Sequence, residues 1–123
     1  MPSSPLCLAV DLGTGGPKVG LATLRGEVLD HEVNAVETQR GADGSATQDA
    51  AEWWRLILAS SKALLERNPG SHARVRAVAV TGQFASTVPV DASGAPTGPC
   101  LTWLDTRGGR HVRDRIGGPF VGE

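Results

Sequence analysis

The sequence predicts an α/β domain in which a mixed sheet carries flanking helices. The first half of the chain has three short apolar or alternating segments separated by glycine-containing turns, which is typical of consecutive antiparallel strands. A segment with helical periodicity then leads into another apolar strand. Because a strand reached through a long helix tends to run parallel to an earlier one, we expect parallel and antiparallel pairs in one sheet.

The first predicted strand leads into a glycine-rich turn. Leu6–Val10 is an apolar run without alternation, which suits a strand buried on both faces. Asp11 and the turn Gly13–Gly16 follow, and Val19–Leu24 supplies the second strand. A third, half-exposed strand is predicted over Val28–Glu37, where apolar and polar residues alternate loosely.

One long helix is predicted over Asp49–Arg67, after a polar loop at Gln39–Thr47. Asp49 is a good N-cap, and Glu52 lies three residues later, as in a capping box. The segment Asn68–Gly70 contains proline and glycine and ends the helix. Tryptophans at the start of the helix are expected to be core anchors. The residues expected to pack the helix on the sheet are Trp54, Leu58 and Leu65.

The remainder of the chain predicts short strands and one more helix. Val75–Thr81 is expected to be a buried strand, and the loop at its carboxyl end lies where ligands of open α/β sheets bind. Thr87–Val90 and Pro99–Trp103 predict a hairpin at an edge position, because Pro89 cannot donate to a ladder. A helix is expected within Leu104–Ile116, ended by Gly117, Gly118 and Pro119. Its cluster Arg107, Arg110, Arg113 and Arg115 is expected to be a solvated face.

Composition narrows the classes of function. The 123 residues carry a formal net charge of −1, which indicates neither a nucleic-acid nor an anionic-membrane partner. Cys7 and Cys100 lie in apolar contexts without metal-ligand spacing, which predicts reduced thiols. The N-terminal apolar run is too short for a signal peptide or a membrane span, so we expect a cytoplasmic protein.

The residues around the first glycine turn suit phosphate binding. Glycine amides can approach an anion closely, Thr14 adds a hydroxyl, and Lys18 adds a compact positive charge. Asp11, at the end of a strand, can hold Mg²⁺ through water. Neither the P-loop pattern nor the dinucleotide fingerprint fits these residues. An ordinary glycine hairpin is the open alternative.

Four segments carry a resemblance to a known family. The motif D-L-G-T-G-G-P-K resembles the first phosphate motif of the actin-like ATPase fold, although Pro17 removes one backbone donor from it. Three further segments resemble motifs of the FGGY family of carbohydrate kinases, in the family's order. They are T-Q-D-A-A-E-W-W, with Ala50 where proline is usual, V-A-V-T-G-Q-F-A-S-T-V-P-V-D-A-S-G-A-P, and W-L-D-T-R.

The resemblance implies a fold and an activity. The fold would be a ribonuclease-H-like, actin-like ATPase subdomain with a mixed sheet ordered 3-2-1-4-5 and flanking helices. The family transfers the γ-phosphoryl group of ATP, with Mg²⁺, to a hydroxyl of a sugar or polyol. Residues 1–123 would then be an incomplete N-terminal portion of the family's N-terminal domain. The general base and the second domain would lie beyond Glu123, so this chain alone is expected to be inactive.

The resemblance also implies site residues. Those on the ATP side are Asp11, which would position Mg²⁺, and Gly13, Thr14, Gly15 and Lys18, which would face the β- and γ-phosphates. Those on the sugar side are Gln83, Phe84, Ala85, Trp103, Asp105 and Arg107. A structural ion pair that anchors the loop is an equally open interpretation of Asp105 and Arg107.

The residues at positions 84 and 85 bear on the class of substrate. Glycerol kinases of the family carry Arg-Glu at Phe84-Ala85, and xylulose kinases carry Met-His or Gln-His. Phenylalanine and alanine cannot hydrogen-bond a hydroxyl through their side chains, which argues against glycerol and also departs from the xylulose kinase pattern. By the resemblance as a whole, a ketopentose such as xylulose is the favoured substrate.

Two alternatives to a sugar kinase stay open. One is a non-catalytic module that binds sugar, nucleotide or a partner chain. The other is a different actin-fold ATPase, against which Gly82-Gln83 and W-L-D-T-R count. The expected macromolecular partner is the remainder of a kinase chain, or a second copy that binds through exposed apolar surface.

Overall fold

The computed structural model describes residues 4–117. These residues form two compact units, which are described separately. The first unit comprises residues 4–37 and 49–84, and the second comprises residues 38–48 and 85–117. In residues 4–117, every helix is too short or too polar to cross a membrane.

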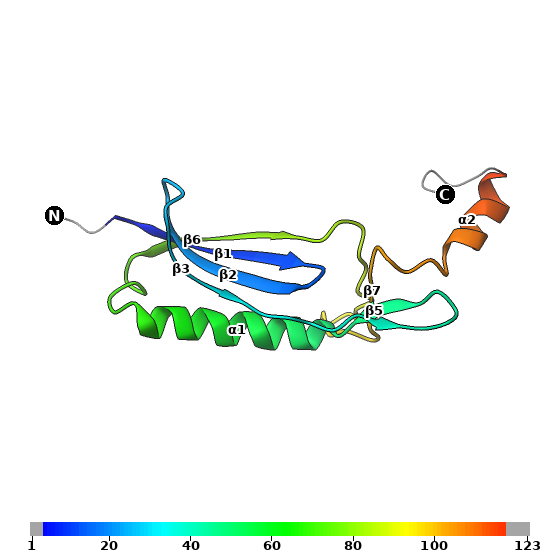
Figure 1. Cartoon of the computed structure of the whole chain (residues 1–123), viewed down its shortest axis with the longest axis horizontal. Coiled ribbons are helices and arrows are strands. Elements are labelled where there is room, and N and C mark those ends of the chain that lie inside the picture. Colours follow the sequence, from blue (N-terminus) through cyan, green and yellow to red (C-terminus); the bar gives the residue numbers. More distant parts are fainter. Residues whose placement is uncertain (1–3, 118–123) are drawn as a thin grey trace. The chain divides into compact units, whose positions relative to one another are not determined.

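A four-stranded mixed sheet forms the first unit (Figure 1). Its strands are β1 (Leu6–Gly13), β2 (Gly16–Thr23), β3 (Val28–Val33) and β6 (Val75–Gly82), in the order β3-β2-β1-β6. The first three pair antiparallel, and β6 runs parallel to β1. This arrangement confirms the α/β class and the expected order of the first four strands.

The segments expected as strands after Val75–Thr81 are not part of this sheet in the described residues. In the second unit, β7 (Cys100–Leu101) pairs with β5 (Ala46–Gln48), which pairs in turn with β4 (Gln39–Arg40). The polar loop expected over Gln39–Thr47 is therefore a hairpin. Its signal in the sequence is Asp43-Gly44, a common hairpin turn pair, and Gly44 has a φ of +86°.

The long helix α1 (Ala50–Arg67) packs on one face of the four-stranded sheet (Figure 1). Its N-cap is confirmed, because the Asp49 side chain accepts a hydrogen bond from the Ala51 backbone N–H at 2.9 Å. Leu64 is fully buried and joins a core with Val10 and Val19. This core lies between the helix and the centre of the sheet.

Two of the three residues expected to pack α1 on the sheet are exposed, and the third, Leu65, is half-buried. Trp54 and Leu58 are 63% and 49% exposed, whereas Trp53, Ser60 and Leu64 are buried. Apolar residues cover much of the helix circumference, so periodicity alone did not select the stripe that faces the sheet. That stripe includes the polar Ser60, whose hydroxyl accepts a hydrogen bond from Asn34 Nδ2 at 2.7 Å.

The fourth strand of the sheet is not buried as expected. Val78 and Val80 of β6 pair in register with Leu8 and Val10, so they lie on the face that carries α1. They are nevertheless 63% and 73% exposed, because α1 packs chiefly over β2. The first strand is not buried on both faces as expected either: Leu6 and Val10 on the helix-bearing face are buried, whereas Cys7 and Ala9 on the other face are half-buried.

The second unit contains the expected hairpin and a shortened helix. Thr87 pairs with Leu101, and Val90 pairs with Pro96, both antiparallel. The helix expected within Leu104–Ile116 starts later, as α2 (Gly109–Ile116), and none of its residues is buried. Gly117 caps it in the left-handed conformation, and the rest of the expected helix stop, Gly118 and Pro119, lies outside the described residues.

Candidate functional site

An ion pair stands beside the glycine turn of the first unit. Asp11 on β1 and Lys18 on β2 are direct cross-strand partners, and Lys18 Nζ lies 3.1 Å from Asp11 Oδ2. The adjacent pair, Val10 and Val19, faces α1. Because side chains alternate along a strand, Asp11 and Lys18 face away from the helix. Both are partly exposed and accessible to a ligand.

Gly13 leaves room for this ion pair. A Cβ at Gly13 would lie 3.1 Å from Lys18 Nζ and 3.9 Å from Asp11 Oδ1. Such a contact would push the lysine aside, because 3.1 Å is closer than an unbonded carbon normally approaches. The absence of a side chain at Gly13 therefore keeps the space next to both charges open.

The turn itself is a two-residue hairpin loop, Thr14-Gly15, since Gly13 and Gly16 are paired. Gly16 has a φ of +124°, and a Cβ there would collide with the Asn34 carbonyl oxygen and the Val36 nitrogen. The Gly15 carbonyl accepts a hydrogen bond from the Val36 N–H at 3.0 Å. The segment after β3 thus holds the turn in place, so this stretch is a hairpin that also presents two opposite charges.

The residues present fit a Mg²⁺ ion that is held mainly by other ligands. Within residues 4–117, no group of three or more histidine, cysteine, aspartate or glutamate side chains is placed to hold a metal ion. Mg²⁺ usually keeps several waters and binds through one or two carboxylates together with substrate phosphates. One accessible carboxylate, Asp11, beside a turn suited to phosphate meets that requirement.

The loop after β6 and the glycine turn after β1 lie at the same end of the sheet, because the two strands run parallel. The Gln83 N–H donates to the Leu12 carbonyl at 2.9 Å, which brings Gln83 next to the end of β1 in the first unit. Phe84 follows and is largely exposed. The structure thus places Gln83 beside Leu12, the residue after Asp11, at the carboxyl end of β1, and a role of Gln83 in binding a ligand stays a prediction.

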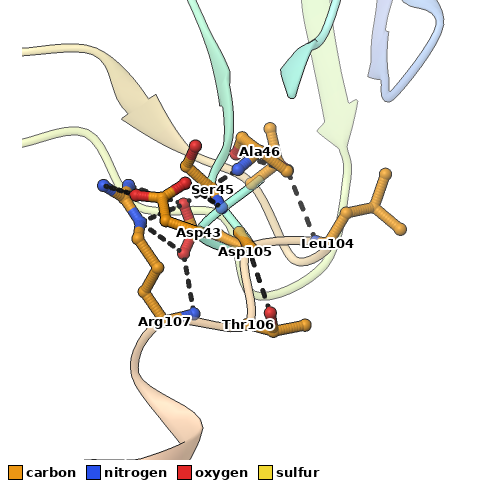
Figure 2. Close-up of polar contacts among 9 residues, drawn as sticks. Asp43, Ser45, Ala46, Leu104, Asp105, Thr106 and Arg107 are labelled. Carbon is orange, nitrogen blue, oxygen red and sulfur yellow. Dashed lines mark hydrogen bonds and ion pairs between the residues drawn. The ribbon is translucent and has the colours of Figure 1, made fainter. Parts of the chain in front are cut away.

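In the second unit, the Asp105 carboxylate accepts several hydrogen bonds (Figure 2). It accepts hydrogen bonds from the Ala46 N–H at 3.1 Å and the Arg107 N–H at 3.1 Å. The Arg107 guanidinium adds bonds from Nε at 3.0 Å and from NH2 at 2.7 Å. The Asp105 side chain is only 7% exposed. The Arg107 guanidinium and then the Ala46 amide hold the pKa of Asp105 well below its usual range.

Arg107 also reaches the hairpin of β4 and β5, since its NH1 lies 4.0 Å from Asp43 Oδ2 (Figure 2). Nearby, the Thr102 N–H and hydroxyl both donate to the Ala46 carbonyl, at 3.0 and 2.9 Å. These bonds tie the W-L-D-T-R segment to the hairpin. The geometry supports the structural ion pair for Asp105 and Arg107, and a direct contact of either with a substrate stays a prediction.

Trp103 presents its side chain from this anchored segment. It is 54% exposed, and its backbone N–H donates to Ser86 Oγ at 3.1 Å. Ala85 precedes that serine and has a φ of +52°, a left-handed conformation that is uncommon for alanine. Ser86 is not among the site residues expected from the sequence, and its one signal there is its place directly after Gln83–Ala85.

Comparison with known proteins identifies the family. The family model described as the FGGY family of carbohydrate kinases, N-terminal domain, matches residues 6–115. The xylulose kinase of Escherichia coli strain K12 is 30% identical over 100 residues, which span 81% of this chain and 20% of that enzyme. The erythritol kinase of Brucella abortus is 28% identical over 115 residues, which span 94% of this chain and 22% of that enzyme.

A solved structure agrees with these matches. The xylulose kinase from Rhodospirillum rubrum superimposes with a TM-score of 0.82 at 25% identity, and the match covers 91% of this chain and 23% of that one. The chain spans about a fifth of the length of the curated relatives it matches, for example 23% and 20% in two of them. From the family match and the glycine hairpin of its mixed sheet, we conclude that the chain belongs to the FGGY family of carbohydrate kinases.

Proposed function

We propose that the chain is the N-terminal part of a kinase that transfers the γ-phosphoryl group of ATP to a hydroxyl of a sugar or polyol. The observation that carries this proposal is the Asp11–Lys18 pair beside Gly13, in a chain whose family consists of carbohydrate kinases. A ketopentose such as xylulose is the favoured acceptor, because xylulose kinases recur among the relatives.

Phosphoryl transfer needs positioning and charge neutralisation more than covalent chemistry by the protein. Asp11 and Lys18 form an ion pair in which each neutralises the charge of the other. We propose that Lys18 pairs with phosphate oxygens of ATP and that Asp11 holds the hydrated Mg²⁺, which would supply further charge neutralisation. The amides and hydroxyl of Gly13, Thr14 and Gly15 would donate to the same phosphates.

The sugar side is proposed to involve Gln83, Phe84 and Ala85 on one segment and Trp103 on another. Gln83 would supply an amide for a hydroxyl group, and the exposed Trp103 would supply an apolar wall for the carbon face of the sugar. Phe84 and Ala85 offer no polar side chain, so they would discriminate by shape. The similarity to an erythritol kinase makes polyols a second class of acceptor to test.

We propose that this reaction needs more than residues 4–117. We propose that the general base and the adenine site come from the remainder of a kinase chain, since the relatives are several times longer. We also propose a cytoplasmic location. Free Cys7 and Cys100 are compatible with that reducing compartment, where ATP is available.

The decisive experiment compares the two lysines of the chain. In the protein expressed from the whole gene, ATP-dependent phosphorylation is measured by coupled ADP release with D-xylulose, erythritol, gluconate and glycerol. Lys18→Ala should lower kcat by about 10²-fold, because the ammonium would neutralise charge in the transition state. It should leave the melting temperature almost unchanged, because exposed ion pairs contribute little to stability.

The matched control is Lys62→Ala, which removes an exposed lysine that pairs with Glu66 at 3.8 Å on α1. It should change neither kcat nor melting. A second variant, Asp11→Asn, should raise the Mg²⁺ concentration needed for half-maximal rate. Wild-type rates in Lys18→Ala together with altered melting would mean that the turn is only a structural hairpin.

A further inference from the structure

The segments around Ala85 and Trp103 meet in a short antiparallel ladder in the second unit. The Thr87 N–H donates to the Leu101 carbonyl at 2.9 Å, and the Leu101 N–H donates back to the Thr87 carbonyl at 2.8 Å. This reciprocal pattern defines a hydrogen-bonded pair. In a regular ladder the next such pair lies two residues further along both strands, which here is Ala85 and Trp103.

The backbone at that next position is not regular. A ladder needs extended backbone, whereas Ala85 has a left-handed φ of +52°. The Trp103 N–H donates to the side-chain hydroxyl of Ser86, with a distance of 3.1 Å. The Ser86 hydroxyl thus takes the acceptor role that a backbone carbonyl has in a regular ladder, and it lets the chain turn at Ala85.

The backbone next to Trp103 is also fixed by hydrogen bonds of Thr102. The Thr102 N–H donates to the Ala46 carbonyl at 3.0 Å, and the Asp105 N–H donates to the Thr102 carbonyl at 2.9 Å. The Trp103 backbone is therefore fixed on both sides, while its side chain stays 54% exposed. An aromatic surface on a fixed backbone is a prepared contact surface, since little freedom is lost when a ligand binds it.

We infer that Ser86 is a positioning residue of the sugar side: its hydroxyl sets the direction of Trp103 and supports the left-handed turn at Ala85. This inference rests on the proposed function of these residues. Backbone strain of this kind persists where the surrounding structure over-determines it, and it concentrates at ligand-binding positions. Ser86 acts through Trp103 and has no proposed contact with the substrate itself.

The structural half of the inference is tested by amide hydrogen exchange on the 123-residue chain. Ser86→Ala should speed exchange at Trp103 by about fivefold, the worth of one hydrogen bond. Ser86→Thr keeps the hydroxyl and should restore the wild-type rate. The matched control is Ser93→Ala, which removes a hydroxyl that donates to Asp91 Oδ1 at 2.6 Å in another turn. It should leave Trp103 exchange unchanged.

The functional half is tested by steady-state kinetics of the protein expressed from the whole gene. Ser86→Ala should raise KM for D-xylulose about fivefold or more, with KM for ATP unchanged and kcat changed less. Ser86→Thr should restore KM for D-xylulose.

Each outcome has one meaning. If the wild-type protein phosphorylates D-xylulose and Ser86→Ala leaves its KM unchanged, the positioning inference is wrong and the kinase proposal stands. If the wild-type protein phosphorylates no member of the panel, both fail. If Ser86→Ala raises KM for ATP and KM for the sugar by the same factor, the substitution damages the fold in general, and the inference is also wrong.

Discussion

The two ion pairs Asp11–Lys18 and Asp105–Arg107 differ in how far they are buried. Lys18 and Asp11 are both partly exposed, so their ion pair contributes little to stability and is free to open for a ligand. Asp105 is almost buried and accepts several donors from Arg107 and the Ala46 amide. At the residue scale, the first pair is suited to binding and the second to holding a loop.

The loop-holding pair predicts a sensitivity to the shape of the cation. Arg107→Lys keeps the charge but loses the planar fork that donates to Asp105 through Nε and NH2. The nearly buried carboxylate then keeps its two backbone donors but loses the guanidinium bonds, so we expect a lower melting temperature by circular dichroism at pH 7. Arg55→Lys is the matched control. Arg55 makes only an exposed pair with Glu52 at 3.6 Å, and its substitution should have no effect.

The same pair gives the sign of a pH dependence. The folded-state pKa of Asp105 lies below its usual value of 3.8, so its stabilising effect is present above that value and is lost as the pH falls further. The melting temperatures of wild type and Arg107→Lys should therefore converge on acidification below pH 3.8. A constant difference across this range, or equal melting at pH 7, would contradict the role given to the pair.

At the element scale, α1 is joined to the sheet at its centre and at its end. Leu64 packs with Val10 and Val19 in the core. At the C-terminal end, Arg67 donates to Asp30 of β3 at 3.1 Å and also pairs with Glu32. The Arg67 bonds lower the pKa of Asp30 to about 2. The apolar contact supplies burial, and the polar contacts fix where the helix ends.

Substitutions of two leucines of α1 test which side of the helix is buried, because Leu64 is buried and Leu58 is half-exposed. Leu64→Ala should destabilise the chain by about 2–5 kcal/mol, because it removes buried methyl groups and leaves a cavity. Leu58→Ala makes the same chemical change at a half-exposed position and should cost less than about 1 kcal/mol. Urea unfolding followed by circular dichroism measures both. Equal losses, or a larger loss for Leu58→Ala, would mean that the helix packs through the other face.

At the scale of the whole molecule, the first unit exposes apolar surface on β6. Val78 and Val80 lie side by side on the helix-bearing face of the sheet but beyond the cover of α1. β6 is also an edge strand of the described sheet. A strand that is both apolar and at an edge favours association with other chains.

This surface predicts self-association of the 123-residue chain. Light scattering should show a mass that rises with protein concentration. Val80→Lys should reduce that rise, because a charge on an edge strand opposes pairing. Val90→Lys places the same charge on an exposed valine of the second unit and should leave association unchanged. A monodisperse monomer at high concentration would show that the exposed face of β6 drives no association.

The sequence by itself determined the features that depend on neighbouring residues. The alternation and turn chemistry predicted β1, β2, β3 and β6, and Asp49 predicted the start of α1. The motif D-L-G-T-G-G-P-K placed Asp11 and Lys18 around a turn, and the hairpin register that brings them together follows from that short loop. The family resemblance rested on the same local motifs and is confirmed by the family match.

Only the tertiary structure decided which residues those elements bury and what holds the loops. The face of α1 with Trp53 and Leu64 was selected by its fit to β2, because periodicity does not distinguish neighbouring apolar stripes. The placement of β7 beside β5 depends on pairing between distant segments, as do the contacts of Asp105 with Ala46 and of Ser86 with Trp103. Such pairings depend on the path of the whole chain, which local patterns do not encode.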